Sequence, residues 1–127
     1  MLTKAMTTTM LPVSDMDRAA RFYADTLGFH QRATGIDGSL IFDAGNGDAI
    51  GLMPTESGAQ TEHTVLSFEV SDIRGEIHDL ERRGITFADY NGPDLKTIDH
   101  VAEMGNEKAA WFSDTEGNIL CVHEVTG

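Results

Sequence analysis

The feature that most constrains the fold of this chain is an internal repeat. The tripeptide Val13-Ser14-Asp15 returns as Val70-Ser71-Asp72, 57 residues further along. Each copy follows an alternating stretch typical of a β-strand, over residues 7–13 and 64–70, and each precedes a helical pattern. One shared tripeptide would mean little, but the strand, the junction and the helix start recur together. The chain is therefore predicted to fold as two copies of one supersecondary unit.

Each predicted helix carries one apolar stripe and a residue suited to each of its ends. The first stripe has spacings of three and four residues and consists of Met16, Ala19, Ala20, Tyr23 and Leu27. The second stripe is thinner and consists of Ile73, Ile77 and Leu80. Asp15 or Ser14, and in the second copy Asp72, can cap the helix starts. Gly28 and Gly84 can supply the left-handed residue that ends a helix.

Three short strands are predicted after each helix. The first set covers residues 31–34, 39–43 and 48–53, and the second covers residues 86–88, 108–113 and 118–124. The turns at 44–47 and 114–117 are rich in Gly, Asn and Asp, as β-hairpins require. Residues 89–106 are polar and are predicted to be an irregular loop. The prediction is an α+β fold of two βαβββ modules in a single domain, residues 1–127, with repeats at about 5–56 and 62–125.

Strand periodicity assigns each side chain to the core or to the opposite face, which we expect to line a cleft. The apolar positions that match between the copies are predicted to form the core: Leu11, Val13, Phe68, Val70, Ile50, Leu52, Leu120 and Val122. The alternate positions are of mixed polarity, as in a binding cleft. They are Thr8, Met10, Pro12, Gly51, Met53, His63, Val65, Ser67, Glu69, Cys121 and His123. One of Trp111 and Phe112 also faces the cleft, and the pattern leaves open which.

The charge of the chain restricts its partners. Nine basic residues stand against 21 acidic residues, for a formal net charge of −12. Nucleic acid and anionic membranes are therefore not expected as partners, because both need clustered Lys and Arg. The charge serves solubility, or it attracts a cationic ligand. The chain has a single cysteine, and it shows neither an apolar run of membrane-spanning length nor a signal-peptide pattern. These features predict a cytoplasmic protein.

Together these motifs resemble the vicinal oxygen chelate superfamily. The resemblance rests on the doubled βαβββ order, the Val-Ser-Asp junctions, Arg21-Phe22-Tyr23 before Leu27-Gly28-Phe29, and Trp111-Phe112-Ser113-Asp114 before Glu116-Gly117-Asn118. Its members include glyoxalase I, extradiol dioxygenases, fosfomycin-resistance transferases and bleomycin-resistance proteins. The resemblance implies two curled four-stranded sheets and a homodimer, but it does not fix the reaction, since one fold hosts many chemistries.

The resemblance also implies four positions at which the enzymes of the superfamily hold a divalent metal with His, Gln or Glu. In this sequence these positions are Thr8, Gly51, Val65 and Cys121. Only the thiol of Cys121 could bind a metal, and one thiolate does not make a site. No metal or other cofactor is therefore expected, which argues against the metalloenzymes of the superfamily.

The prediction for function is a metal-free small-molecule binding protein similar to the bleomycin-resistance or antibiotic-sequestering members. The ligand would be apolar or aromatic. The predicted lining consists of Thr8, Met10, Met53, His63, Val65, Ser67, Trp111, Cys121 and His123. No catalytic residue is assigned, because sequestration needs complementarity alone.

Two alternatives remain open at this stage. One is a lyase or dioxygenase, either with a shifted metal site built from His63, His123 and Cys121 or Glu69, or without a cofactor and with His63 as a base. The other is a dimeric interaction domain whose cups are filled by its own side chains.

Overall fold

The computed structural model describes residues 1–58 and 61–127 of the chain. They form two compact units. The first unit comprises Met1–Thr61 together with Asp114–Asn118, and the second comprises Glu62–Ser113 together with Ile119–Gly127. The units follow the two repeats with one exception, because the turn Asp114–Asn118 lies within the second repeat and belongs to the first unit.

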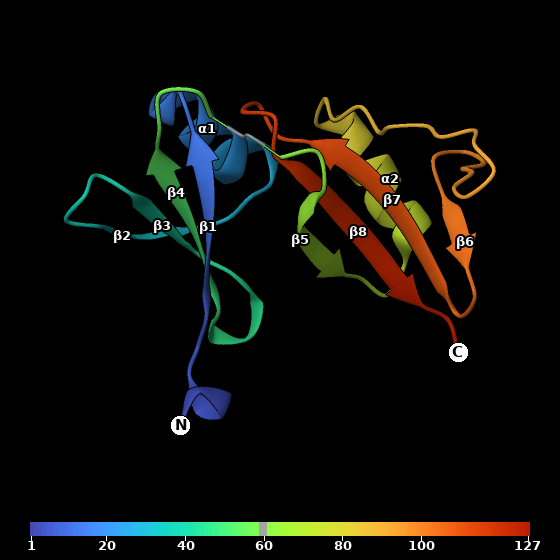
Figure 1. Ribbon diagram of the computed structural model, residues 1–127, viewed down its shortest axis with the longest axis horizontal. Coiled ribbons are helices and arrows are strands. Elements are labelled where there is room, and N and C mark those ends of the chain that lie inside the picture. Colours follow the sequence, from blue (N-terminus) through green and yellow to red (C-terminus); the bar gives the residue numbers. More distant parts are fainter. Residues whose placement is uncertain (59–60) are drawn as a thin grey trace. The chain divides into compact units, whose positions relative to one another are not determined.

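The first unit has the predicted βαβββ order (Figure 1). Its elements are β1 (Thr8–Val13), α1 (Met16–Arg21), a π-helical segment (Phe22–Thr26), β2 (Gln31–Thr34), β3 (Leu40–Asp43) and β4 (Ala49–Pro54), with short 3₁₀ turns at Leu2–Lys4 and Gly45–Gly47. The four strands form one sheet in the order β1-β4-β3-β2. β1 runs parallel to β4, and the other neighbours are antiparallel.

The first helix starts as predicted and then widens. Asp15 caps α1 by accepting a hydrogen bond from the Arg18 amide at 3.1 Å. One turn later the Leu27 amide donates to the Phe22 carbonyl at 2.9 Å, which is the bond of a π-helix. The Tyr23 side chain in this turn is completely buried, and its ring lies 5.4 Å from that of Phe22. Gly28, with φ of 82°, follows the helix as predicted.

The second unit repeats the arrangement with a longer and regular helix. Its elements are β5 (Thr64–Glu69), α2 (Ile73–Arg82), β6 (Ala102–Met104), β7 (Glu107–Ser113) and β8 (Ile119–Val125). The sheet order β5-β8-β7-β6 is the counterpart of the order in the first unit, and Figure 1 shows α2 beside β7 and β8. Two mixed four-stranded sheets with few helices confirm the predicted α+β fold.

One predicted strand is wrong. Residues 86–88 make only an isolated bridge, from Phe87 to Phe112, and the outer strand lies instead at Ala102–Met104, within the segment predicted to be a loop. The reason is packing: Phe87 is 3% exposed, and its ring meets that of Phe112 edge-on at 5.3 Å. The chain touches the outer edge of β7 at this position, where the Ala88 amide donates to the Trp111 carbonyl at 2.8 Å, and it pairs continuously with β7 only over Ala102–Met104.

The core follows the predicted periodicity closely. The predicted core residues of β1, β4 and β8 are at most 3% exposed: Leu11, Val13, Ile50, Leu52, Leu120 and Val122. Phe68 and Val70 are only partly buried. Phe112 is 2% exposed and belongs to the core, so the neighbouring Trp111 lies on the opposite face of β7. Among the described residues, no helix has the length and apolar character needed to cross a membrane.

Candidate functional site

The strand register of the second unit brings several predicted site residues onto one face of its sheet. Ser67 pairs with Cys121, Glu69 with His123, and Trp111 with Cys121. Because paired residues on neighbouring strands share a face, all five side chains lie on the side of the sheet opposite the Phe112 core. We call this surface the polar cleft face.

A row of three polar side chains crosses the polar cleft face. The Ser67 hydroxyl lies 2.6 Å from Nδ1 of His123, and Nε2 of His123 lies 3.7 Å from Oε1 of Glu69. The His123 side chain is 20% exposed, whereas that of Glu69 is 71% exposed. Both imidazole nitrogens therefore have a polar neighbour, and Nδ1 is within hydrogen-bond distance of the Ser67 hydroxyl. The sequence placed these residues on one face but gave no sign of this row.

An aromatic wall stands on the same face. The Trp111 indole donates a hydrogen bond from Nε1 to the Thr64 hydroxyl at 3.1 Å. The Tyr90 ring meets the indole at 89° with centroids 5.6 Å apart. These two contacts fix the indole plane, which a flat ligand needs as a stacking surface. The sequence pattern did not indicate Thr64 or Tyr90 as site residues. Tyr90 was detectable only as an aromatic residue in an otherwise polar segment.

The Cys121 thiol is part of the wall of the site and not a reactive group. Cys121 is 5% exposed, and its sulfur donates to the Val122 carbonyl at 3.4 Å. Burial raises the pKa of the thiol above its ordinary value, so the thiol stays protonated at neutral pH. A protonated thiol is a weak nucleophile.

The corresponding face of the first unit carries two methionines, Met10 and Met53, and we call it the methionine face. Met10 and Ile41 both pair with Gly51, and Met53 pairs with Pro12. A Cβ atom on Gly51 would lie 2.5 Å from the Met10 sulfur, so the Met10 side chain occupies the space above this glycine. Met10 remains 43% exposed. Thr8, at the start of β1, is also exposed. The face therefore offers flexible, polarizable surface at its methionines, while Thr8 and Asp43, which pairs with Arg32, supply hydrogen-bonding groups.

The four positions at which the superfamily would place its metal ligands do not fit a divalent ion. Gly51 and Val65 have no donor atom in their side chains, and Gly51 is covered by Met10. Thr8 offers only a neutral hydroxyl, so the buried thiol of Cys121 is the one strong donor among these four side chains. Catalytic metal sites take about three protein ligands from His, Cys, Asp and Glu. These four residues lack that donor set.

The alternative metal site is not assembled either. His63 precedes β5 and is exposed, so it is not a member of the row formed by Ser67, His123 and Glu69. Within residues 1–58 and 61–127, no three His, Cys, Asp or Glu side chains gather in a way that could hold a metal ion.

The geometry defines a doubled βαβββ protein with a polar row and a fixed indole on one sheet and exposed methionine on the other. A sequence model of the Glyoxalase/Bleomycin resistance protein/Dioxygenase superfamily matches residues 5–122. The chain belongs to this superfamily.

Individual relatives are consistent with this assignment. The uncharacterized protein YurT of Bacillus subtilis (strain 168) is 28% identical over 127 residues, covering 88% of this chain and 92% of YurT. A superfamily member from Sphaerobacter thermophilus DSM 20745 has a TM-score of 0.76 at 24% identity, covering 98% of this chain and 99% of that one. TnmS3, an antibiotic binding protein from Streptomyces sp. CB03234, has a TM-score of 0.67 at 23% identity, covering 98% of each chain. At these identities, the two solved structures establish the fold alone.

Proposed function

We propose that this protein binds a small organic molecule on its polar cleft face without a metal ion. The observation that carries the proposal is the polar cleft face, where a fixed indole stands beside the row formed by Ser67, His123 and Glu69. Apolar and aromatic surface with a few oriented polar groups is the usual composition of a ligand site. The antibiotic-binding role of TnmS3, a protein of the same fold, supports this reading.

The proposed ligand is flat, apolar or aromatic, and carries a positive charge. Trp111 offers a stacking surface for such a ligand. Glu69 presents an exposed carboxylate at the edge of the polar cleft face, in a chain with a formal net charge of −12. A cation on the ligand would be attracted by the Glu69 carboxylate and by the net negative charge of the chain.

Fluorescence provides a direct test, because Trp111 is the single tryptophan of the chain. Titration with 9-aminoacridine, a planar aromatic cation, should quench Trp111 emission and reach saturation. Replacing Glu69 by Gln should weaken this binding, whereas replacing Glu103, an exposed acid of β6, by Gln should not. Quenching that never saturates, or equal affinities for both variants, would contradict the proposal.

Metal analysis of the purified protein tests the proposal that no metal ion is bound. We expect native mass spectrometry and elemental analysis to find Zn, Ni, Fe and Mn far below one ion per chain. Near-stoichiometric metal would restore a metalloenzyme and overturn the interpretation of Thr8, Gly51, Val65 and Cys121.

A second candidate function is metal-independent catalysis with His123 as the base. The 2.6 Å contact between Ser67 and His123 favours it, and it moves the base from His63, where the sequence placed it, to His123. In such a reaction the Ser67 oxygen would attack an electrophile while its proton passes to His123. A fluorophosphonate probe tests this: the Ser67 oxygen would bond to phosphorus, fluoride would leave, and peptide mapping would find the adduct on Ser67. If no adduct formed on Ser67, this candidate function would be excluded and only the binding function would stand.

The assembly and the location of the protein remain proposals that rest on the superfamily. We propose a homodimer, for which light scattering should give twice the chain mass of 13.8 kDa. A mass near that of one chain would contradict it. The proposed location is the cytoplasm, where the lone buried thiol of Cys121 would stay reduced.

A further inference from the structure

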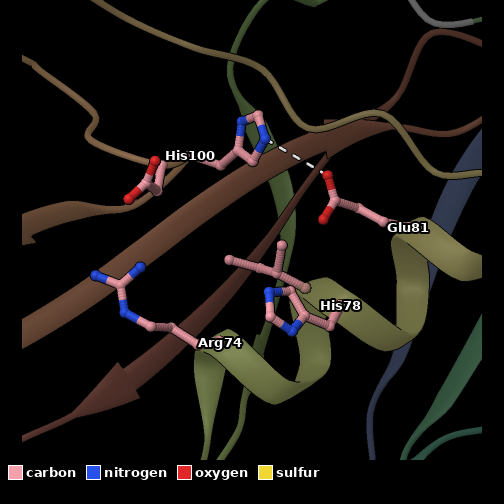
Figure 2. A pocket seen from close by; sticks show the side chains of 6 residues that line it. Arg74, His78, Glu81 and His100 are labelled. Carbon is pink, nitrogen blue, oxygen red and sulfur yellow. Dashed lines mark ion pairs between the residues drawn. The ribbon is translucent and has the colours of Figure 1, made fainter.

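A second hollow lies in the second unit, away from the polar cleft face. It has a volume of about 290 Å³ and is lined by Arg74, Ile77, His78, Glu81, Asp99 and His100. Figure 2 shows Arg74 and His78 along α2, with His100 facing Glu81 across the opening. The His100 ring lies 6.2 Å from that of Phe87, which packs on the core side of the sheet. The hollow is therefore on the helix-covered side, opposite Trp111.

Arg74 combines two features, since it has no carboxylate partner among the described residues and it lines the hollow. In a chain with 21 acidic and nine basic residues, most arginines find a carboxylate, such as Arg18 with Glu116 and Arg32 with Asp43. Arg74 has no ion pair or hydrogen bond with any other described residue, although it lines a hollow that also holds two acids. A guanidinium with free donors at a concave surface is suited to a carboxylate from outside the chain.

The opposite wall is a tight turn whose second residue, His100, stands where its backbone favours glycine. Ile98 and Val101 pair in an antiparallel bridge, with hydrogen bonds of 2.9 and 3.1 Å, so Asp99 and His100 form a two-residue turn. Both have positive φ, 51° and 73°. Tight turns of this kind strongly favour Asn-Gly or Asp-Gly. A residue with a Cβ is sterically destabilised in the left-handed conformation. A histidine at this position supplies an imidazole but makes the turn less stable than glycine would.

The imidazole is held in a defined position. Nδ1 of His100 lies 2.9 Å from Oδ1 of Asp89, and Nε2 lies 3.5 Å from Oε2 of Glu81. The His100 side chain is 31% exposed, so it closes one side of the hollow and still contacts solvent. Ile77, which is 3% exposed, contributes an apolar floor.

We propose that this hollow is a second ligand site, which takes a small zwitterion that carries a carboxylate and an ammonium group. The carboxylate binds Arg74, and the ammonium group binds Glu81 and Asp99. A simple anion would face the two acids, and a simple cation would face the arginine, so both signs are needed on one ligand. The volume suits a molecule the size of an amino acid. This inference is independent of the ligand of the polar cleft face.

Calorimetric titration with glycine, γ-aminobutyrate, L-lysine and L-arginine tests the site. Acetate and ethylammonium serve as controls that carry one charge each. We expect at least one zwitterion to bind saturably at one molecule per chain, and both controls to bind at least about tenfold more weakly. Failure of all four zwitterions to saturate would overturn the proposal.

Two variants localise the binding. R74Q should weaken it by about tenfold or more, while R21Q, which removes an equivalent exposed charge from α1, should leave it unchanged. The double variant D99N/H100G installs Asn-Gly, the sequence that this turn prefers. It should retain or raise the free energy of unfolding while losing binding by about tenfold. Unchanged binding in R74Q or in D99N/H100G would overturn the proposal.

Discussion

The two units share one strand order but hold the starts of their helices in different ways. In the first unit, one oxygen of Glu116 accepts hydrogen bonds from the Ser14 and Asp15 amides at 2.9 Å each, while the other bonds Arg18 Nε at 2.7 Å. The Glu116 side chain is fully buried. In the second unit, the half-buried Glu124 accepts a single bond, from the Ile73 amide at 2.9 Å.

The two helices also differ in length and in regularity. α1 has six residues before it widens into the π-helical segment, whereas α2 runs for ten regular residues with three buried side chains. A short helix gains little from its own hydrogen bonds, so it depends on external contacts. We infer that a charged network fixes the first helix and apolar packing fixes the second. The predictions below test that contrast, beginning with the largest expected effect.

Replacement of Glu116 by Gln should give the largest loss. The variant keeps the shape of the side chain but removes the negative charge that binds Arg18 and the two amides. Loss of hydrogen bonds to a buried charge strongly destabilises a folded protein. We expect the free energy of unfolding to fall by roughly 3 kcal/mol. Urea unfolding, followed by circular dichroism, measures the change. A loss below about 1 kcal/mol would show that packing, rather than this network, fixes α1.

The same carboxylate predicts a loss of stability in acid. Burial raises the pKa of Glu116, but the hydrogen bonds from Arg18, Asp15, Thr115 and Ser14 outweigh it and bring the pKa from 4.5 to about 2. A pKa below the unfolded value means that the stabilisation is complete above pH 4.5 and is lost as the pH falls toward 2. Urea midpoints between pH 6 and pH 2.5 should therefore fall more steeply for the wild-type protein than for Glu116→Gln. Parallel curves would contradict the assigned pKa.

Replacement of Tyr23 by Phe should have the next largest effect. The buried Tyr23 hydroxyl donates to Oδ2 of Asp114 at 2.7 Å, so the variant leaves a buried acceptor with one donor fewer. Asp114 keeps bonds from the Glu116 and Asn118 amides, which limits the loss to about 1–2 kcal/mol. Burial and the negative charge of Asp114 also raise the pKa of Tyr23. Absorbance at 295 nm should therefore show one of the two tyrosines ionising only when the protein unfolds in alkali.

The contrast between the units was only partly predictable from the sequence. The repeat and its periodicity predicted the buried faces of β1, β4 and β8, because side-chain direction in a strand depends only on parity. Edge strand β6 was missed because three residues paired on one side leave no periodic signal. The role of Glu116 was missed as well, because its partners lie about 100 positions away in the sequence.

The candidate site shows the same limit. Parity placed Ser67, Cys121 and His123 on one face, and the register chose Trp111 over Phe112 as the residue that joins them. Periodicity cannot predict that Ser67 and His123 form a hydrogen bond, because the bond depends on rotamers and on the shift in β5 between Thr64 and Leu66. It also cannot predict the hollow beside α2, since that wall depends on two residues with positive φ.

Replacement of Glu124 by Gln completes the comparison and should have the smallest effect. The amide oxygen of Gln can still accept the bond from Ile73, so only the attraction between a charge and the start of α2 is lost. That attraction contributes about 0.3–1 kcal/mol at a helix terminus. Urea unfolding of this variant beside Glu116→Gln measures the contrast within one protein. If Glu124→Gln destabilised the protein as much as Glu116→Gln, the two helix starts would be equivalent, and the shortness of α1 would need another explanation.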